Sequence, residues 1–308
     1  MPNAGGPTDE QPPVNEQEML ESLAEVERGG IPLAAQRRMR ELRDHGGLFT
    51  SDLSVADYAI CQQQKLRVLS QVMGSSIYQV GYQTTPWPTM MGGAFMYELD
   101  ALSDAWNEVR RLALNRIAQE AALVGADAVV GVELRTGAHE FTEGAIEYMV
   151  VGTAVSHERS PDADSGAGAP VLTELSVADY SKLLQGGFEP VGIVAWSSVF
   201  FVAASYSTQM LSGGGLGFTQ NQELREFTQG LYEARETVVQ RMSVQATQLG
   251  ASGIVGVRIN HGISRVSMGS GRYQSGGLMV NFHAIGTAIR QTEEVPLYPP
   301  ETTIDLTT

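Results

Sequence analysis

Side chains that could bind a soft metal ion are few, because the chain has one cysteine, Cys61, and five histidines. A soft-metal site needs Cys and His side chains that converge, and neither a Cys-x-x-Cys nor a His-x-x-x-His pair occurs. One group in a polar hairpin, His139, Glu140 and Glu143, could share an ion, and a symmetric assembly would multiply each ligand. The alternative is that these three residues are simply solvated. A divalent or heavy-metal ion at this weak site is the only cofactor that the sequence indicates.

Two further residues of these types lie in apolar surroundings. Cys61 has no visible ligand partner, so we expect a buried thiol. His283 lies within an apolar, strand-like segment, so we expect an interior or interface histidine whose ring has a hydrogen-bond partner.

Nucleophilic catalysis is not supported by the sequence. No Gly-x-Ser-x-Gly elbow occurs, and the single cysteine has no convincing histidine partner. The glycine-rich segment 213–218 lacks the Gly-Lys-Ser/Thr of a phosphate-binding loop and the last glycine of a dinucleotide fingerprint. Carboxylates are plentiful, but most follow polar faces, and in a ring they would bind divalent cations only weakly. We therefore expect a protein that is not an enzyme.

An apolar connector before the first long helix could bind a partner. Residues 86–93 combine prolines and glycines with Trp87, Met90 and Met91. An exposed tryptophan beside two flexible methionines suits protein docking or a lid over a ligand. The alternative is that these side chains pack over the helix that follows.

The charge balance excludes several classes of partner. The 308-residue, 33.1 kDa chain has 35 acidic against 20 basic residues, a net charge of −15. Nucleic-acid binding and docking on anionic lipid both need clustered Lys and Arg, so we expect neither. No window of about 18 apolar residues occurs, so we expect no membrane insertion. The acidic, Pro-rich start is unlike a signal peptide and a single cysteine allows no intrachain disulfide, so we expect a cytoplasmic protein.

Three segments recur in the same order, which indicates an internal repeat. The hexapeptide Leu-Ser-Val-Ala-Asp-Tyr occurs at 53–58 and again at 175–180, at an offset of 122 residues. A glycine-rich segment at 125–132 recurs at 250–257, at an offset of 125 residues. A third segment at 151–155 recurs at 285–289, at an offset of 134 residues. The growing offset predicts two tandem copies of one domain, the second with longer loops.

Each copy shows the same order of elements. Short runs rich in Val, Ile, Phe and Tyr are typical of half-buried strands, and long stretches with apolar residues at steps of three and four are typical of helices. The sequence predicts an α+β fold with two tandem β-β-α-β-β domains, each with one long helix on a small antiparallel sheet. The predicted strands are 66–73, 77–82, 128–135 and 146–156 in the first copy, and 191–196, 199–205, 253–260 and 278–290 in the second.

Turn and cap residues delimit these elements. Asp100 or Ser103 could cap the first long helix and Asn221 the second. Gly125 and Gly250 stand where each long helix must end in a left-handed residue. Within the repeated hexapeptide, Ser54 and Ser176 could each cap a helical turn. The predicted parts are an acidic disordered N-terminus (1–16), short N-terminal helices (17–52), domain 1 (53–156), a linker (157–174), domain 2 (175–291) and an extended acidic tail (292–308).

The ordered combination of these motifs resembles the YbjQ family, a family named for heavy-metal binding. The resemblance covers roughly residues 66–156 and 188–290. It implies a small dodecin-like α+β subunit that assembles into pentameric rings, and it implies no established reaction. The family's members usually have one such domain, whereas this chain has two. The residues that carry the signature in the two copies are Gly125, Asp127, Gly131, Gly152 and Thr153, and then Gly250, Gly256, Gly286 and Thr287.

The leading interpretation is a non-enzymatic, self-assembling protein, with rings built from five chains. Its main partner would be further copies of itself, and the N-terminal helices or acidic tails could recruit another protein. The family name supports a second hypothesis, a heavy-metal-binding or sequestering assembly. A third hypothesis is a dodecin-like small-molecule binder that stacks a flat ligand on Trp87, Trp106 or Trp196.

Overall fold

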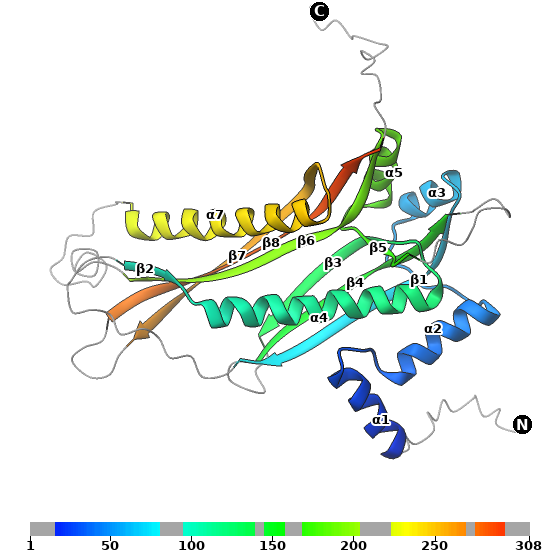
Figure 1. The fold of residues 1–308 in the computed structure, drawn as a ribbon, viewed down its shortest axis with the longest axis horizontal. Coiled ribbons are helices and arrows are strands. Elements are labelled where there is room, and N and C mark those ends of the chain that lie inside the picture. The colour runs from blue at the N-terminus through cyan, green and yellow to red at the C-terminus, as the bar shows by residue number, and fades with distance from the viewer. Residues whose placement is uncertain are drawn as a thin grey trace, which may run out of the picture.

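The architecture is α+β, with two four-stranded, mainly antiparallel sheets and two long helices (Figure 1). A sheet and a long helix recur in the same order in both halves of the chain, so the predicted tandem α+β domains are confirmed. The computed structural model describes residues 16–80, 95–138, 145–157, 168–203, 223–268 and 275–292.

Domain 1 packs one long helix, α4, on its sheet. The apolar stripe of α4 includes Val109, Ala113 and Ile117, which are fully buried because residues three and four apart share one helix face. The stripe contacts inward-facing residues of the sheet such as Val72 and Val150. The elements are α3 (Val55–Gln63), β1 (Leu66–Gln79), α4 (Asp100–Val124), β3 (Ala128–Ala138), β4 (Ala145–His157) and the added β5 (Val171–Leu172), in the sheet order β1-β4-β3-β5.

Domain 2 repeats this arrangement. Helix α7 buries Ala234, Val238 and Met242 against the second sheet. The elements are α5 (Val177–Gln185), β6 (Phe188–Ala203), α7 (Arg225–Gln248), β7 (Gly253–Met268), β8 (Ser275–Gln291) and the added β2 (Phe95–Glu98), in the sheet order β2-β6-β8-β7.

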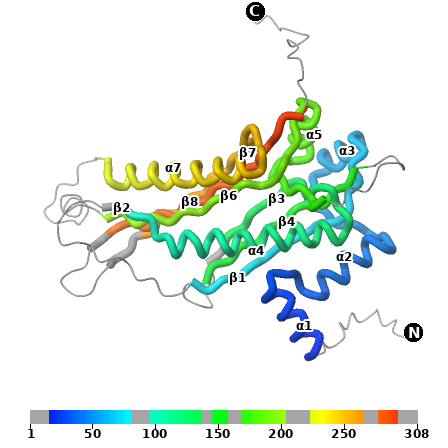
Figure 2. Tube along the Cα trace, in the orientation of Figure 1, coloured from blue at the N-terminus to red at the C-terminus, as the bar shows by residue number. Residues whose placement is uncertain are grey.

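Strand β6 is covered on both faces, because successive side chains of a strand point to opposite sides. Val194 and Val202 belong to the core beneath α7. Val199 belongs instead to the core beneath α4. Helix α4 therefore packs against both sheets, and α7, the second sheet, α4 and the first sheet follow one another (Figure 2).

Two short strands are exchanged between the domains. Strand β5, which precedes domain 2, pairs in parallel with β3 of domain 1, and β2, which precedes α4, pairs with the end of β6. The segment expected to be a flexible linker, 157–174, therefore contains a strand, and its Thr173 and Glu174 are buried. Strands of two and four residues are too short to show a period, so the sequence does not reveal them.

The two strands predicted at the start of each copy are one long strand. Strand β1 runs through the segments 66–73 and 77–82 as far as Gln79, and β6 runs through 191–196 and 199–203. Gly74, which lies between the two predicted ranges, has a contact of its own. Gly74 lets the backbone of α4 approach, since a Cβ there would lie 2.0 Å from the carbonyl oxygen of Ala113.

The predicted helix caps are partly wrong. Helix α4 follows Leu99, and no side chain caps it; Ser103 instead bonds to β6. Asn221 lies outside the described residues. Helix α4 does end at Gly125, which is left-handed with φ +81°, and Gly250 has φ +68° one residue after the cap of α7. Ser54 and Ser176 do cap α3 and α5.

Both sheets contain a bulge at the same place. Gly131 in β3 and Gly256 in β7 have φ +64° and +67°, and each lies where the register with the last strand shifts. A Cβ on the opposed Gly152 would lie 2.7 Å from Cγ1 of Val129, so only glycine leaves room for the bulged strand. Gly286 has the same role in domain 2.

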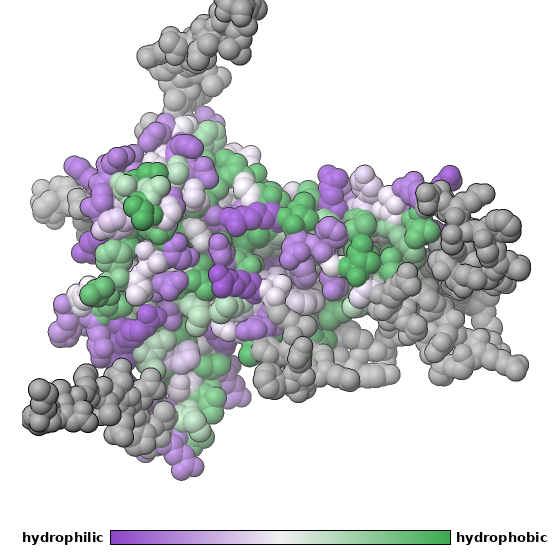
Figure 3. Space-filling view, turned by 180° about the vertical axis from the view of Figure 1, so that it is seen from behind, coloured by the Kyte–Doolittle hydropathy of each residue, from purple (hydrophilic) through white to green (hydrophobic). Residues whose placement is uncertain are grey.

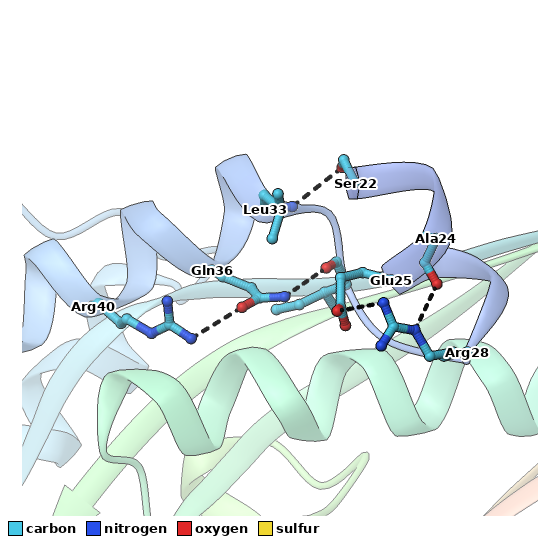
Figure 4. A network of polar contacts seen from close by, with 8 residues as sticks. Ser22, Ala24, Glu25, Arg28, Leu33, Gln36 and Arg40 are labelled. Carbon is cyan, nitrogen blue, oxygen red and sulfur yellow. Dashed lines mark hydrogen bonds and ion pairs between the residues drawn. The ribbon is translucent and has the colours of Figure 1, made fainter. Parts of the chain in front are cut away.

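The N-terminal helices α1 (Glu16–Glu27) and α2 (Leu33–His45) form a hairpin beside α4. Polar contacts hold its turn (Figure 4): Leu33 N–H donates to Ser22 Oγ at 3.2 Å, and Gln36 Nε2 donates to the carbonyl of Ile31 at 3.1 Å. Arg116 of α4 fixes the same turn by donating to the carbonyls of Gly30 and Val26. No described helix is both long and apolar enough to cross a membrane.

Candidate functional site at the interface of the two domains

Helix α4 of domain 1 satisfies the free edge of β6 in domain 2. Asn107 bonds twice to Ser197: its Nδ2 donates to the Ser197 carbonyl at 2.8 Å, and its Oδ1 accepts from the Ser197 N–H at 2.9 Å. The N–H of Val199 donates to Ser103 Oγ at 2.9 Å, and its carbonyl accepts from the Leu99 N–H at 2.7 Å. These bonds pair backbone groups that would otherwise lie open at the strand edge.

A buried polar cluster surrounds the hydroxyl of Ser197. His283 Nδ1 lies 2.9 Å from Ser197 Oγ, Tyr148 Oη lies 3.5 Å away, and Arg110 donates to it at 3.4 Å. The Trp106 ring packs edge-on against Tyr148 and His283, with ring centroids 5.7 and 4.8 Å apart. The expected hydrogen-bonded interface histidine is therefore confirmed.

Burial sets the protonation of this cluster. Desolvation, together with the charge of Arg110, lowers the pKa of His283 to about 4, so its ring is neutral at neutral pH. Desolvation also lowers the pKa of Arg110 to about 10 and raises that of Tyr148. Ser197 and His283 resemble a nucleophile and its base, but Ser197 is fully buried and His283 is a weak base. The arrangement fits a structural role, in which the hydrogen bonds of the cluster hold the two domains together.

A cavity of about 190 Å³ lies beside this cluster, lined by both domains. Glu174 is only 2 % exposed, and neither of its carboxylate oxygens has a hydrogen-bond partner among the described residues. Burial raises its pKa to about 7, opposed by Arg258, whose Nε lies 3.6 Å from Oε2. The cavity is smaller than the roughly 300–1,000 Å³ typical of ligand pockets.

The repeated hexapeptide has two different environments. Ser54 and Ser176 accept the N–H of Asp57 and Asp179 alike, at 3.1 and 3.2 Å. Their neighbours differ, as the exposed fractions show. Val177 is 0 % and Tyr180 4 % exposed in the second copy, whereas Val55 is 88 % and Tyr58 36 % exposed in the first. Val177 and Tyr180 are buried because they pack on domain 1, against residues such as Ala128, Val130 and Val155.

The predicted metal and docking residues lie outside the described residues. These are His139, Glu140 and Glu143, and also Trp87, Met90 and Met91. Among the side chains that the structure does describe, no three His, Cys, Asp or Glu residues are arranged to hold a metal ion. Cys61 is fully buried, as expected, and desolvation raises its pKa, which disfavours the thiolate that binds metals. The described part of the chain therefore fits a resident heavy metal poorly.

The remaining signature residues lie in turns, or where the segment that precedes each domain (residues 48–54 and 170–176) contacts the sheet of that domain. Asp127 accepts the N–H of His157 at 2.9 Å, which closes the end of the first sheet. Thr153 donates its hydroxyl to Asp52, and Thr287 lies 2.9 Å, hydroxyl to hydroxyl, from Thr173. The two threonines thus hold equivalent segments, one before each domain.

Sequence reasoning missed the interface residues Glu174, Asn107 and Arg110. Glu174 directly precedes the repeated hexapeptide, and the other two lie on the polar side of the α4 stripe. The only signal in the sequence was the position of Glu174 beside the repeated hexapeptide. The partners of all three residues come from the other domain, at no regular distance along the sequence.

The architecture is that of a tandem α+β protein with two copies of one domain, and comparison with known families gives its relationship. The family described as "Putative heavy-metal-binding" matches residues 56–158 and 207–292. The chain belongs to this family, with one copy in each domain, in agreement with the resemblance to the YbjQ family.

Individual relatives cover one or both domains. The chain is 36 % identical over 245 residues to "Encapsulin nanocompartment protein Rv1762c" of Mycobacterium tuberculosis, across 79 % of this chain and 86 % of the relative. It is 39 % identical over 95 residues to a UPF0145 protein of Clostridium novyi, across 30 % of this chain and 86 % of the relative. A UPF0145 protein of Alkaliphilus metalliredigens is 38 % identical over 96 residues, across 30 % and 87 %. No solved structure gives a significant match.

Proposed function

We propose that this protein is a self-assembling structural component and not an enzyme. One observation carries the proposal: the valine and tyrosine of an identical hexapeptide are buried on domain 1 in the second copy and exposed in the first copy. Val177 is fully buried on domain 1, while Val55, its counterpart, is 88 % exposed. The same region also exposes Leu48 and the stacked rings of Phe49 and Tyr58, and exposed apolar side chains that are grouped in this way are typical of a protein interface.

The relative in Mycobacterium tuberculosis supports the same function, because its name describes a nanocompartment protein and the match spans both domains. The finer proposal is a closed ring based on five chains, in the cytoplasm, where buried Cys61 would stay reduced. The N-terminal hairpin and the acidic tails remain candidate contact points for another protein.

The two alternative functions have less support. A metal site at His139, Glu140 and Glu143 stays a prediction, since only the family description favours it. A stacked flat ligand has little room, because Trp106 packs against Tyr148 and His283, and Trp196 lies beneath two arginines.

Native mass spectrometry of the purified chain, with elemental analysis of the same sample, tests the proposal. We expect a mass that is a multiple of the 33.1 kDa chain, five-fold in the finer proposal, without stoichiometric metal. Val55→Asp should shift the mass to the single chain, because it puts a charge into the expected contact. Leu23→Asp, a matched change at a residue of α1 that is 56 % exposed, should leave the mass unchanged. A single wild-type chain would refute self-assembly.

A further inference from the structure

We propose that chains join head to tail by repeating, between chains, the contact that joins domain 1 to domain 2 within one chain. The inference rests on the proposed self-assembly and names its surfaces. The acceptor is the outer edge of β7 in domain 2. The donor is the first lead-in segment (residues 48–54) together with α3, both from a second copy of the chain. Inside one chain, the second lead-in segment (residues 170–176) together with α5 makes the corresponding contact on domain 1.

Backbone bonds define the contact within the chain. The second lead-in segment lies along β3: Val171 and Thr173 donate their N–H groups to the carbonyls of Asp127 and Val129 at 3.0 and 2.9 Å. The bulge completes the pairing, because Gly131 and Val132 donate to the carbonyls of Leu175 and Thr173 at 2.9 and 3.0 Å.

The equivalent edge in domain 2 is open within the single chain. Strand β7 is the last strand of its sheet, and its bulge has the same shape as that of β3. Gly256 and Val257, the counterparts of Gly131 and Val132, have no such backbone hydrogen bonds to a neighbouring strand among the described residues, although the side chains of Glu174 and Leu175 lie beside Gly256. Val257, Ile259 and Ile263 are 44–49 % exposed along this edge. An apolar edge strand of this length invites another strand to pair with it.

The first lead-in segment has the matching shape. It is bonded to its own domain: the Thr50 carbonyl accepts the N–H of Gln71, and Asp52 accepts the Thr153 hydroxyl. In the same way, Thr173 and Glu174 of the second segment bond to Thr287. Its other side is uncovered, with Leu48 94 % and Phe49 37 % exposed. The segment is therefore anchored on its own domain at the positions equivalent to those that anchor its counterpart.

Helix and sheet faces repeat the same asymmetry. On α4, Asn107 contacts Ser197 of the second sheet, but Tyr232, the counterpart of Asn107 on α7, is 58 % exposed. On the sheets, Val199 is fully buried beneath α4, but Ile77, its counterpart in β1, is 61 % exposed. Thus, among the described residues, the outer face of α7 and the outer face of the first sheet are an uncovered pair. Figure 3 shows hydrophobic residues interspersed with hydrophilic ones on the side of the molecule opposite to that of Figure 1.

A second copy of this chain is the occupant, because each of these exposed surfaces is the counterpart of a surface already paired inside the chain. The contact joins unlike ends, so repeating it gives a closed ring or a filament. It also makes the domains alternate. Five chains would then form a single ring of ten alternating domains.

Mixed variants, each with one introduced cysteine and with the buried Cys61 replaced by alanine, test this geometry. Val129 and Leu172 are direct partners in the β3–β5 pairing; their counterparts are Ile254 and Thr50. Neighbouring strands lie about 4.8 Å apart, within the range for a disulfide. A chain with Thr50→Cys, mixed under oxidising conditions with a size-tagged chain carrying Ile254→Cys, should give a cross-linked heterodimer. The chain with Thr50→Cys should not cross-link to a tagged chain with Ser264→Cys, an exposed position further along β7.

Each outcome separates the two proposals. Cross-linking confined to the Thr50–Ile254 pair supports the head-to-tail contact. An oligomer that cross-links equally at Ser264, or only between two Thr50→Cys chains, overturns that contact and leaves self-assembly standing. A wild-type single chain in native mass spectrometry overturns both.

Hydrogen exchange on the unmodified protein gives a second, variant-free measurement. In the assembled protein, the amides of Gly256 and Val257 should exchange at least about ten-fold more slowly than after dilution to single chains. Rapid exchange of both amides in the intact oligomer would overturn the strand pairing.

Discussion

Domain 1 and domain 2 have one fold, but their long helices are buried to different extents. Helix α4 is covered by its own sheet, by the second sheet and by α2, and even its Arg110, Arg116 and Glu120 are buried. Helix α7 buries only its stripe of Gly230, Ala234, Val238, Met242 and Ala246. The fold of one domain therefore presents two contact faces, one on its long helix and one on its sheet. Within the chain only the outer faces of α4 and of the second sheet are filled.

The largest expected effect concerns the closest helix–sheet contact. Gly74→Val should lower the free energy of unfolding by about 3 kcal/mol or more, because a Cβ would lie 2.0 Å from the backbone of α4 and the core cannot expand cheaply. Domain 2 has Trp196 at the equivalent position, so α7 and α4 meet their sheets differently. Urea denaturation measures the change. Gly262→Ala, where nothing lies within 4 Å of the new Cβ, is the control and should be nearly neutral.

The next prediction compares one residue in two places. Val177→Ala should cost about 2 kcal/mol at any protein concentration, because Val177 is fully buried within the chain. Val55→Ala should cost little in dilute single chains, where Val55 is 88 % exposed, and a similar amount in the assembled protein. Denaturation over a range of protein concentrations checks this. Equal small costs for Val55→Ala at every concentration would show that Val55 lies outside the contact between chains.

The sequence could predict the features that depend on residues close together in the chain, but not those that depend on contacts between the two domains. The long helices, the bulge glycines and the serine caps follow from local patterns, so the two copies and their α+β class were predictable. The exchange of β2 and β5 was not, because a two- to four-residue strand is stabilised by the edge it joins and not by its own residues. The same holds for Ser197 and Glu174, whose partners come from the other domain.

A smaller effect concerns the buried carboxyl of Glu174. Its pKa in the folded protein is about 7, above the ordinary 4.5, so folding favours the protonated form. This contribution to stability is fully present below pH 4.5 and is lost as the pH rises through about 7. Glu174→Gln should therefore stabilise the protein above about pH 8 by on the order of 1–2 kcal/mol, and change it little near pH 5. Thermal unfolding across this range measures the difference between the two proteins. A gap that does not change with pH would contradict the raised pKa.

The smallest expected effect tests what the two hexapeptides have in common. Ser54→Ala and Ser176→Ala should each cost about 1 kcal/mol, because each hydroxyl accepts one N–H at the start of a short helix, at 3.1 and 3.2 Å. The two costs should agree in dilute single chains, where the caps are formed within their own helices whatever surrounds the neighbouring valine and tyrosine. Denaturation of the two variants in parallel gives both values. If Ser54→Ala were neutral while Ser176→Ala were costly, α3 would need a neighbouring chain in order to form. The open end would then fold on binding, and the view that it is preformed would have to be abandoned.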